Sequence, residues 1–217
     1  MRVSVTTIEQ FRRVMTEDWA LDAELIAQVK GQPFEPSWQM KAGTAWHAAL
    51  EEGRRPDEED DGAVRFGDYW ISLPALERAR ALVPSGACEV KISVPWQTAY
   101  GPVNVVSQTD LLVGATVIDH KAKFSTLDIK PYEASLQWRF YLENFGATRF
   151  QYMLWQFWEP KNWTLELADM AQCSFFPYVG MRQDCQRWLD RFMDWCYFRD
   201  LLPFLNREGR SPELEAA

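Results

Sequence analysis

The sequence lacks any apolar run long enough to cross a bilayer, and residues 1–5 begin no secretory apolar segment. It also lacks a phosphate-binding loop, a glycine-rich nucleotide signature and any internal repeat. These absences argue against membrane proteins, nucleotide-driven motors and repeat proteins. We therefore expect a cytoplasmic protein that makes no membrane contact.

Cysteines are few and widely spaced, and none of them forms a C-x-x-C pair. Paired cysteines at short spacing are the usual signature of a structural zinc site, so the sequence gives no zinc signal. We expect reduced, mostly buried thiols at the four positions. These are Cys88, Cys173, Cys185 and Cys196.

Basic residues are outnumbered, with 23 Lys and Arg against 31 Asp and Glu and a net charge of −8. This balance disfavours nucleic-acid binding, because phosphate contacts depend on Lys and Arg. Much of the acidic excess is local, in residues 51–61, and we expect residues 52–62 to form a solvated loop. The charge therefore weighs against a nucleic-acid enzyme without excluding one. The basic residues near the candidate site are Lys121, Lys123, Lys130, Arg139 and Arg149.

The chain has 217 residues, of which 47% are hydrophobic, and this is enough for one domain with a sizeable core. It contains 11 Trp and 13 Phe, which we expect mostly to pack inside, with some facing a partner or a second subunit. We expect an α/β (α+β) fold with helices around a central mixed sheet. We assign residues 6–31 to N-terminal helices, 41–175 to the core, 180–202 to a C-terminal helix and 206–217 to a frayed tail, all within one domain spanning 1–217.

Finer boundaries follow from caps and alternation. Thr6 or Thr7 should cap the first helix, and Glu35-Pro36-Ser37 should begin the third. Further helices are predicted over 21–30, 74–82 and 131–142, and strands over 63–72, 150–158 and 163–167, whereas 173–176 is ambiguous. The strongest prediction is a three-stranded antiparallel meander over 87–98, 103–113 and 116–123, with a tight reversal at Gly114.

The last two strands of this meander bring charged side chains together. Asp119 and Lys121 share one face of their strand, because side chains alternate with period two. The reversal at Gly114 places Asp110 beside them. Two neighbouring carboxylates repel unless a positive group lies between them, and a hard divalent cation with oxygen ligands suits this position.

The pattern of Asp110 followed by Asp119-His120-Lys121 resembles the D…(D/E)-x-K core of the PD-(D/E)xK nuclease superfamily. Residues 43–51, which contain His47, resemble the G-x-x-x-H-x-x-L-E helix of its RecB-like branch. Gln137-x-x-x-Tyr141 resembles the Q-x-x-x-Y helix that follows the D-x-K strand there. The matches stand in the family's order and cover residues 41–142.

The resemblance implies a restriction-endonuclease-like core and a set of roles. It implies catalysis by Asp110, Asp119 and Lys121, binding of one or two Mg²⁺ or Mn²⁺ ions by His47, Asp110, Asp119 and the backbone carbonyl of His120, and substrate contacts from Gln137 and Tyr141. Relatives that act in CRISPR adaptation carry an iron–sulfur cluster, but the late cysteines here are too widely spaced for that pattern. We expect no such cluster.

Bland interpretations of several positions stay open. A lone helix histidine such as His47 is more often packed than metal-bound. Glu51 could orient His47 or simply be an exposed acid, and Glu89 could be an accessory acid or part of a solvated strand face. Gln137 and Tyr141, at i and i+4, could be an ordinary helix pair.

The expected function is therefore metal-dependent hydrolysis of DNA phosphodiesters. A free-standing domain of this size resembles phage-type exonucleases that resect DNA ends for recombination or repair. Such enzymes act with single-strand annealing partners and often form homo-oligomers. Two alternatives are an endonuclease of the same fold and a catalytically degenerate binding or assembly protein.

Overall fold

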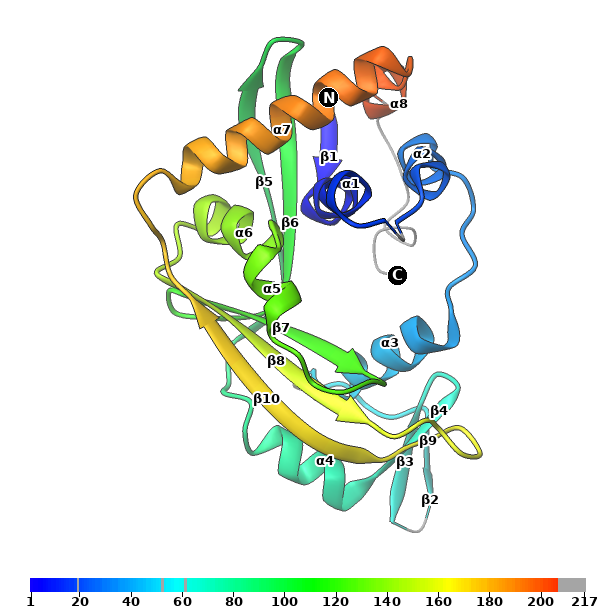
Figure 1. The fold of residues 1–217 in the computed structure, drawn as a ribbon. Helices are drawn as coiled ribbons and strands as arrows, with labels where there is room; N and C mark the ends of the chain where they lie inside the picture. The colour runs from blue at the N-terminus through cyan, green and yellow to red at the C-terminus, as the bar shows by residue number, and fades with distance from the viewer. Residues whose placement is uncertain (19, 52, 61, 207–217) are drawn as a thin grey trace.

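A six-stranded mixed sheet runs through the molecule in the order β1-β6-β7-β8-β10, with β5 on the other edge of β6. The computed structural model describes residues 1–18, 20–51, 53–60 and 62–206 (Figure 1). Its strands are β1 (Arg2–Ser4), β5 (Ala87–Thr98), β6 (Gly101–Val113), β7 (Thr116–Lys123), β8 (Arg149–Phe157) and β10 (Leu167–Phe175). The predicted meander is confirmed, with β6 beginning two residues earlier than expected.

One edge of β6 is shared by two different strands. β1 pairs with it in parallel at Asn104–Val106, and β7 pairs with it antiparallel at Leu111–Val113. The opposite edge is covered by β5 over residues 101–112. Residues 107–110 therefore lie at a fork between β1 and β7, where no strand among the described residues pairs with that edge of β6.

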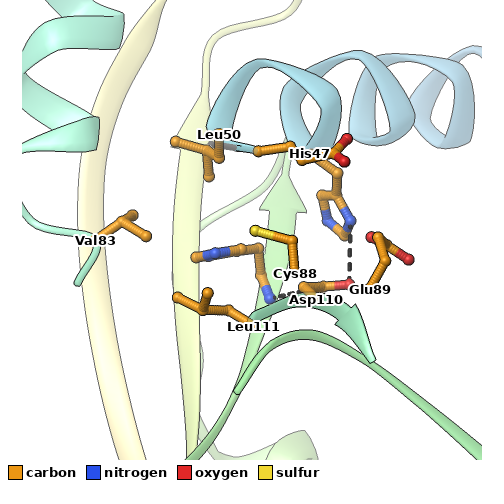
Figure 2. A pocket seen from close by; sticks show the side chains of 9 residues that line it. His47, Leu50, Val83, Cys88, Glu89, Asp110 and Leu111 are labelled. Atoms are coloured by element: carbon orange, nitrogen blue, oxygen red, sulfur yellow. Dashed lines mark hydrogen bonds and ion pairs between the residues drawn. The ribbon is translucent and has the colours of Figure 1, made fainter. Parts of the chain in front are cut away.

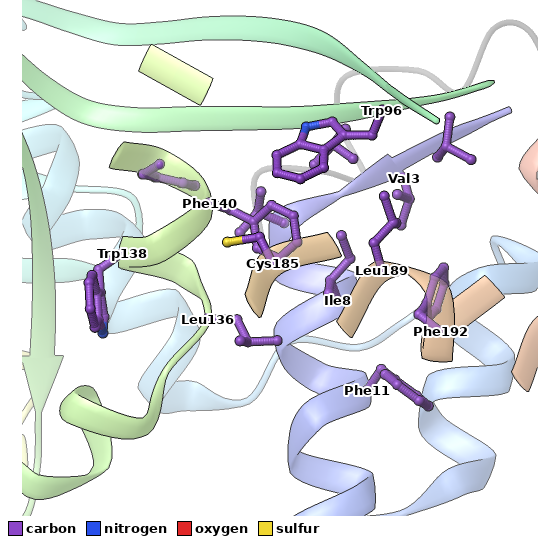
Figure 3. Close-up of a cluster of buried hydrophobic side chains, with 14 of the residues drawn as sticks. Val3, Ile8, Phe11, Trp96, Leu136, Trp138, Phe140, Cys185, Leu189 and Phe192 are labelled. Atoms are coloured by element: carbon purple, nitrogen blue, oxygen red, sulfur yellow. The ribbon is translucent and has the colours of Figure 1, made fainter. Parts of the chain in front are cut away.

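Helices cover both faces of the sheet, and each face has its own core. One face carries α1 (Val5–Thr16), α2 (Asp22–Lys30), α5 (Lys130–Ala134), α6 (Gln137–Phe145), α7 (Met181–Phe198) and α8 (Leu202–Leu205). Side chains such as Ile8, Phe140 and Phe192 interlock there (Figure 3). Successive residues of a strand contribute to opposite cores, so Val117 packs into this core and Ile118 into the other.

The other face carries α3 (Trp38–Leu50), α4 (Leu73–Arg80) and a second sheet, which Figure 1 shows at the lower end of the molecule. That four-stranded sheet has the order β2-β3-β4-β9. Its strands are β2 (Glu58–Asp60), β3 (Ala63–Phe66), β4 (Tyr69–Ser72) and β9 (Thr164–Leu165). Among the described residues, no helix combines the length and apolarity that a membrane span requires.

Several sequence-based boundaries were wrong for local reasons. Ser4, not Thr6 or Thr7, caps α1, because its hydroxyl accepts from the Thr7 N–H at 3.2 Å. The predicted strand over 63–72 is the hairpin β3-β4, which reverses at Gly67 with a positive φ of 56°. Within the acidic stretch predicted as a loop, β2 pairs with β3, and Arg65 neutralises Glu58 at 3.0 Å.

Other corrections come from tertiary pairing. The strand predicted over 163–167 is shorter and joins the second sheet, because β9 pairs in parallel with β4. The ambiguous segment at 173–176 belongs largely to β10, which pairs antiparallel with β8. The C-terminal helix ends at Phe198 and is followed by α8. Of the predicted frayed tail, residues 207–217 lie outside the described residues, and the division into one domain stays a prediction.

Candidate active site

Asp110 lies at the fork of β6 and is absent from the strand register on both sides. The β5–β6 pairing runs from Ala87 opposite Leu112 onward but has no pair between Glu89 and Asp110. The β6–β7 pairing ends at Leu111 opposite Ile118, one step before Asp119. The Asp110 carboxylate then accepts the His120 N–H at 2.6 Å, in the place of a strand carbonyl. Because the strands diverge here, the Asp110 carboxylate accepts a backbone N–H that a strand carbonyl would otherwise accept.

His47 reaches Asp110 because α3 packs closely along β7. A Cβ at Gly43 would lie 3.8 Å from the Cβ of Ala122, so the helix and strand touch at this point. One turn further along α3, the His47 ring lies 6.1 Å from the His120 ring. Its Nδ1 is 3.5 Å from Asp110 Oδ1 (Figure 2). The structure therefore brings together the distant pair His47 and Asp110.

Electrostatics favour charge on both members of this pair. Burial opposes ionisation of Asp110, but the facing His47 imidazole and the Lys121 ammonium outweigh it and hold the pKa of Asp110 below its usual range. Burial likewise lowers the pKa of His47, but the Asp110 carboxylate outweighs it and raises that pKa overall.

Asp119 and Lys121 form a second pair on the opposite side of the fork. Lys121 Nζ lies 2.7 Å from Asp119 Oδ2, and the Gln137 side-chain amide donates to Asp119 Oδ1 at 2.7 Å. Among the described residues, the buried Oδ2 has no hydrogen-bond partner besides this ammonium. Burial, followed by repulsion from Asp110 and despite the attraction of Lys121, raises the pKa of Asp119 to about 6. The Lys121 pKa is raised because the two carboxylates outweigh its burial, so its ammonium stays protonated.

Gln137 and Tyr141 support the site from α6. The Tyr141 hydroxyl donates to the Gln108 carbonyl at 2.6 Å, which satisfies an open acceptor of the β6 fork. Tyr141 is only 3% exposed, so in this conformation it is a buried contact between α6 and β6. A direct substrate contact by Tyr141 stays a prediction. Gln137 faces Asp119, and this contact fixes one oxygen of the carboxylate.

A residue far along the chain holds this helix in place. Glu9 of α1 is 6% exposed and accepts the Leu136 N–H at 2.7 Å, and Arg12 pairs with the same carboxylate at 2.9 Å. Because Leu136 donates to Glu9, and Ser135 leaves the helical conformation with ψ of 140°, the helix predicted over 131–142 is broken into α5 and α6. Sequence reasoning missed Glu9, since its partner lies 127 residues away.

Two further acids lie near His47. Glu51 and Glu89 line a small pocket together with His47, Asp110 and His120. Glu89 has a positive φ of 51°, which is unusual for a non-glycine residue in a strand, and its carboxylate accepts from the Gln108 amide at 2.5 Å. Its pKa is raised by burial and, after an opposing effect of Gln108, by Asp110. Glu89 is an exposed residue of β5 that also lines the pocket, so both interpretations of it stay open.

The donors present suit a hard cation in type, but they do not form a complete cage. No group of three or more His, Cys, Asp and Glu side chains able to hold a metal occurs among the described residues. Mg²⁺ commonly uses only one or two carboxylates and completes its shell with water and substrate phosphate. The buried Asp119 Oδ2, which contacts only the Lys121 ammonium among the described residues, fits such a ligand. The chemistry of the site thus fits Mg²⁺ or Mn²⁺.

His120 and the cysteines have limited roles in this arrangement. The His120 ring accepts the Trp155 Nε1–H at its Nδ1, 3.2 Å away, and burial lowers the pKa of His120 to about 4. A metal contact from His120 therefore depends on its backbone carbonyl and stays a prediction. Cys185 and Cys196 are buried free thiols on α7, while Cys88 and Cys173 are partly exposed free thiols on β5 and β10. The absence of an iron–sulfur cluster stays a prediction.

Comparison with solved structures identifies the fold. LHK-Exo in complex with dAMP matches with a TM-score of 0.52 and 15% identity, over 91% of this chain and 88% of that one. A second structure of LHK-Exo, an alkaline exonuclease from Laribacter hongkongensis, matches with a TM-score of 0.48 and 15% identity. The match covers 91% of this chain and 89% of that one. The protein SSO0001 matches with a TM-score of 0.52 and 15% identity, over 88% of this chain and 75% of that one.

The chain has a mixed α/β fold similar to that of LHK-Exo in complex with dAMP. The predicted fold class, a central mixed sheet flanked by helices, is thereby confirmed. No protein-family model matches the sequence, and no curated protein matches it.

Proposed function

We propose that this protein is a metal-dependent DNA exonuclease of the PD-(D/E)xK type that resects DNA ends in phage-type recombination or repair. The observation that carries the proposal is the meeting of Asp110, Asp119 and Lys121 with His47 at the β6 fork. These residues are remote in sequence, and their meeting was predicted from motifs alone. The similarity of fold to LHK-Exo, whose structure contains dAMP, supports the proposal.

In the proposed mechanism, each residue has a role that its surroundings support. Asp110 and Asp119, with His47 and the His120 carbonyl, would hold one or two Mg²⁺ or Mn²⁺ ions. Such an ion lowers the pKa of a bound water and shields phosphate charge. Because the ammonium of Lys121 stays protonated beside Asp119, it is suited to orient the attacking water and to stabilise negative charge at phosphorus.

Gln137 has the role of a positioning residue in this scheme. Its amide holds one oxygen of Asp119 at 2.7 Å, while Lys121 contacts the other, so the carboxylate has a fixed orientation. Tyr141 and Glu9 act one step further back by holding α6 against the fork. Candidate partners of the protein are DNA, a single-strand annealing protein and a second copy of the chain.

A second function class is a degenerate nuclease fold that binds or assembles without cleaving. The net charge of −8 favours this alternative, because DNA binding depends on cations. An endonuclease of the same fold is a third outcome. Incubation of linear and circular DNA with Mg²⁺, Mn²⁺ or EDTA separates the three. Loss of linear DNA alone supports the exonuclease, nicking of circles supports the endonuclease, and no metal-dependent cleavage leaves the binding protein.

A further inference from the structure

An aromatic surface lies beyond the candidate site, at the carboxyl end of β7. Trp38, the first residue of α3, is 37% exposed, and its ring meets the Phe124 ring edge-on at 4.7 Å. Phe124 in turn rests on the buried Phe157 ring, 5.8 Å away. The Tyr69 hydroxyl donates to the Trp38 carbonyl at 3.0 Å and fixes the start of the helix. An exposed indole is thus held on a rigid aromatic support.

This surface is continuous with the candidate site through both of its elements. Phe124 follows Lys121 by three residues, which is about 10 Å along an extended chain. Trp38 lies on the same helix as His47, and the Gly43–Ala122 contact lies between the two positions. A DNA strand that leaves the site along β7 would therefore reach the indole within a few nucleotides.

Two cations lie across β7 from the aromatic surface, because Lys123 faces Tyr132 of the first core while Phe124 packs on the second. Lys123, next to Phe124, lies 5.8 Å above the Tyr132 ring. Burial, followed by the nearby Arg13, lowers the pKa of Lys123, against an opposing effect of Asp128. Arg13 also pairs with Glu9 at 3.3 Å. Arg13 and Lys123 thus bring positive charge to this end of β7, although the protein carries a net charge of −8. DNA phosphates bind to Lys and Arg side chains of this kind.

We propose that Trp38 and Phe124 form a stacking subsite for one unpaired base of a DNA strand whose phosphates lie near Arg13 and Lys123. The proposal rests on the nuclease function and adds the substrate class, because a base can stack on an indole only when it is free of a duplex. Every base has a flat face, so the subsite tolerates any sequence.

The test measures binding of a labelled single-stranded oligodeoxythymidylate of about 12 nucleotides, with EDTA present so that no cleavage occurs. Trp38→Ala should weaken this binding about tenfold, whereas Trp38→Phe, which retains a stacking ring, should stay within about threefold of wild type. Phe198→Ala is the matched control, because Phe198 is 79% exposed but lies at the end of α7. Lys123→Gln should reduce the slope of log affinity against log salt by about one. Circular dichroism establishes that each variant is folded.

Each outcome decides the proposal. Equal weakening by Trp38→Ala and Phe198→Ala overturns it, as does equal weakening of single-strand and duplex binding by Trp38→Ala. Wild-type protein that binds no single strand also overturns it, and an apolar protein partner would then be the better occupant of this surface. Trp38-dependent binding without metal-dependent cleavage would keep the subsite and reject the nuclease. Metal-dependent cleavage that is indifferent to Trp38 would do the reverse.

Discussion

Each side of the β6 fork carries one aspartate, and the pKa values of the two are shifted in opposite directions. Asp110 faces the His47 imidazole and the His120 N–H, and its pKa lies below the usual range. Asp119 faces Lys121 and Gln137, yet burial and its neighbour raise its pKa to about 6. Two carboxylates in one buried site cannot both ionise freely unless further positive charge is supplied. The difference indicates that Asp119 is the acid most relieved by a bound cation.

The two sides are also supported differently. The Asp110 side depends on close packing of α3 on β7 at Gly43 and Ala122. The Asp119 side depends on α6, which is held by the buried Glu9 of α1. Changes to each support should therefore affect one side of the site and leave the other in place.

The largest expected effect follows loss of the Lys121 charge. Lys121→Ala should lower cleavage by about 10²- to 10⁴-fold with little loss of DNA binding, because the ammonium acts at the reacting phosphate. Lys123→Ala, two residues along the same strand face, is the control and should weaken binding more than turnover. Single-turnover cleavage and equilibrium binding measure the two effects. Equal turnover in Lys121→Ala and wild type would contradict the assignment.

Removal of Glu9 should cost the most folding stability. Glu9→Ala leaves Arg12 and the Leu136 N–H without their buried partner and should lower the free energy of unfolding by about 3 kcal/mol. Glu17→Ala removes a more exposed partner of the same arginine, with 28% side-chain exposure, and should cost less than about 1 kcal/mol. Urea unfolding measures both, and similar losses would show that α6 does not depend on Glu9.

Neutral replacements should separate the two acids. In EDTA near neutral pH, Asp110→Asn should destabilise the protein by about 1–3 kcal/mol, since a favourable charge and a charged hydrogen-bond acceptor are lost. Asp119→Asn should stay within about 1 kcal/mol of wild type, because ionised Asp119 is itself unfavourable in the folded protein. The reverse order of these losses in urea unfolding would refute the contrast between the two acids.

The same contrast predicts how stability and metal binding depend on pH. The folded pKa of Asp119 is raised from 3.8 to about 6, so its ionisation costs stability above that range, and the cost is relieved as pH falls from 6 towards 4. The Asp110 pKa is lowered, so its contribution is present above about pH 4 and is lost as the acid is protonated below it. Mn²⁺ must displace any proton on Asp119, so its affinity should fall by at most about tenfold per pH unit below 6. Calorimetric titration tests this, and affinity independent of pH would place the metal elsewhere.

The smallest expected effect tests the packing on the Asp110 side. Gly43→Ala should raise the free energy of unfolding by about 0.5–1 kcal/mol, because alanine favours helix and its Cβ would meet Ala122 at an ordinary 3.8 Å. Gly86→Ala is the contrasting variant, since a Cβ there would lie 2.5 Å from the Leu112 carbonyl oxygen. Thermal unfolding should rank the two on opposite sides of wild type.

The sequence by itself determined the meander, and it determined which strand or helix carries each motif residue. Apolar and polar residues alternate through residues 87–98 and 116–123, so the strands and the shared face of Asp119 and Lys121 follow from local geometry. The helix of His47 and that of Gln137 were also predicted, because their spacing is local.

Only the tertiary structure decided how these parts meet. The fork of β6 exists because β1 and β7 pair with different lengths of one edge, and the break before Gln137 exists because Glu9 takes the Leu136 N–H. The strained backbone of Glu89 and the indole of Trp38 beside Phe124 likewise arise from contacts between distant segments. Alternation and helical spacing depend on neighbours in the chain, whereas strand pairing, burial and the resulting carboxylate pKa values depend on residues that only folding brings together.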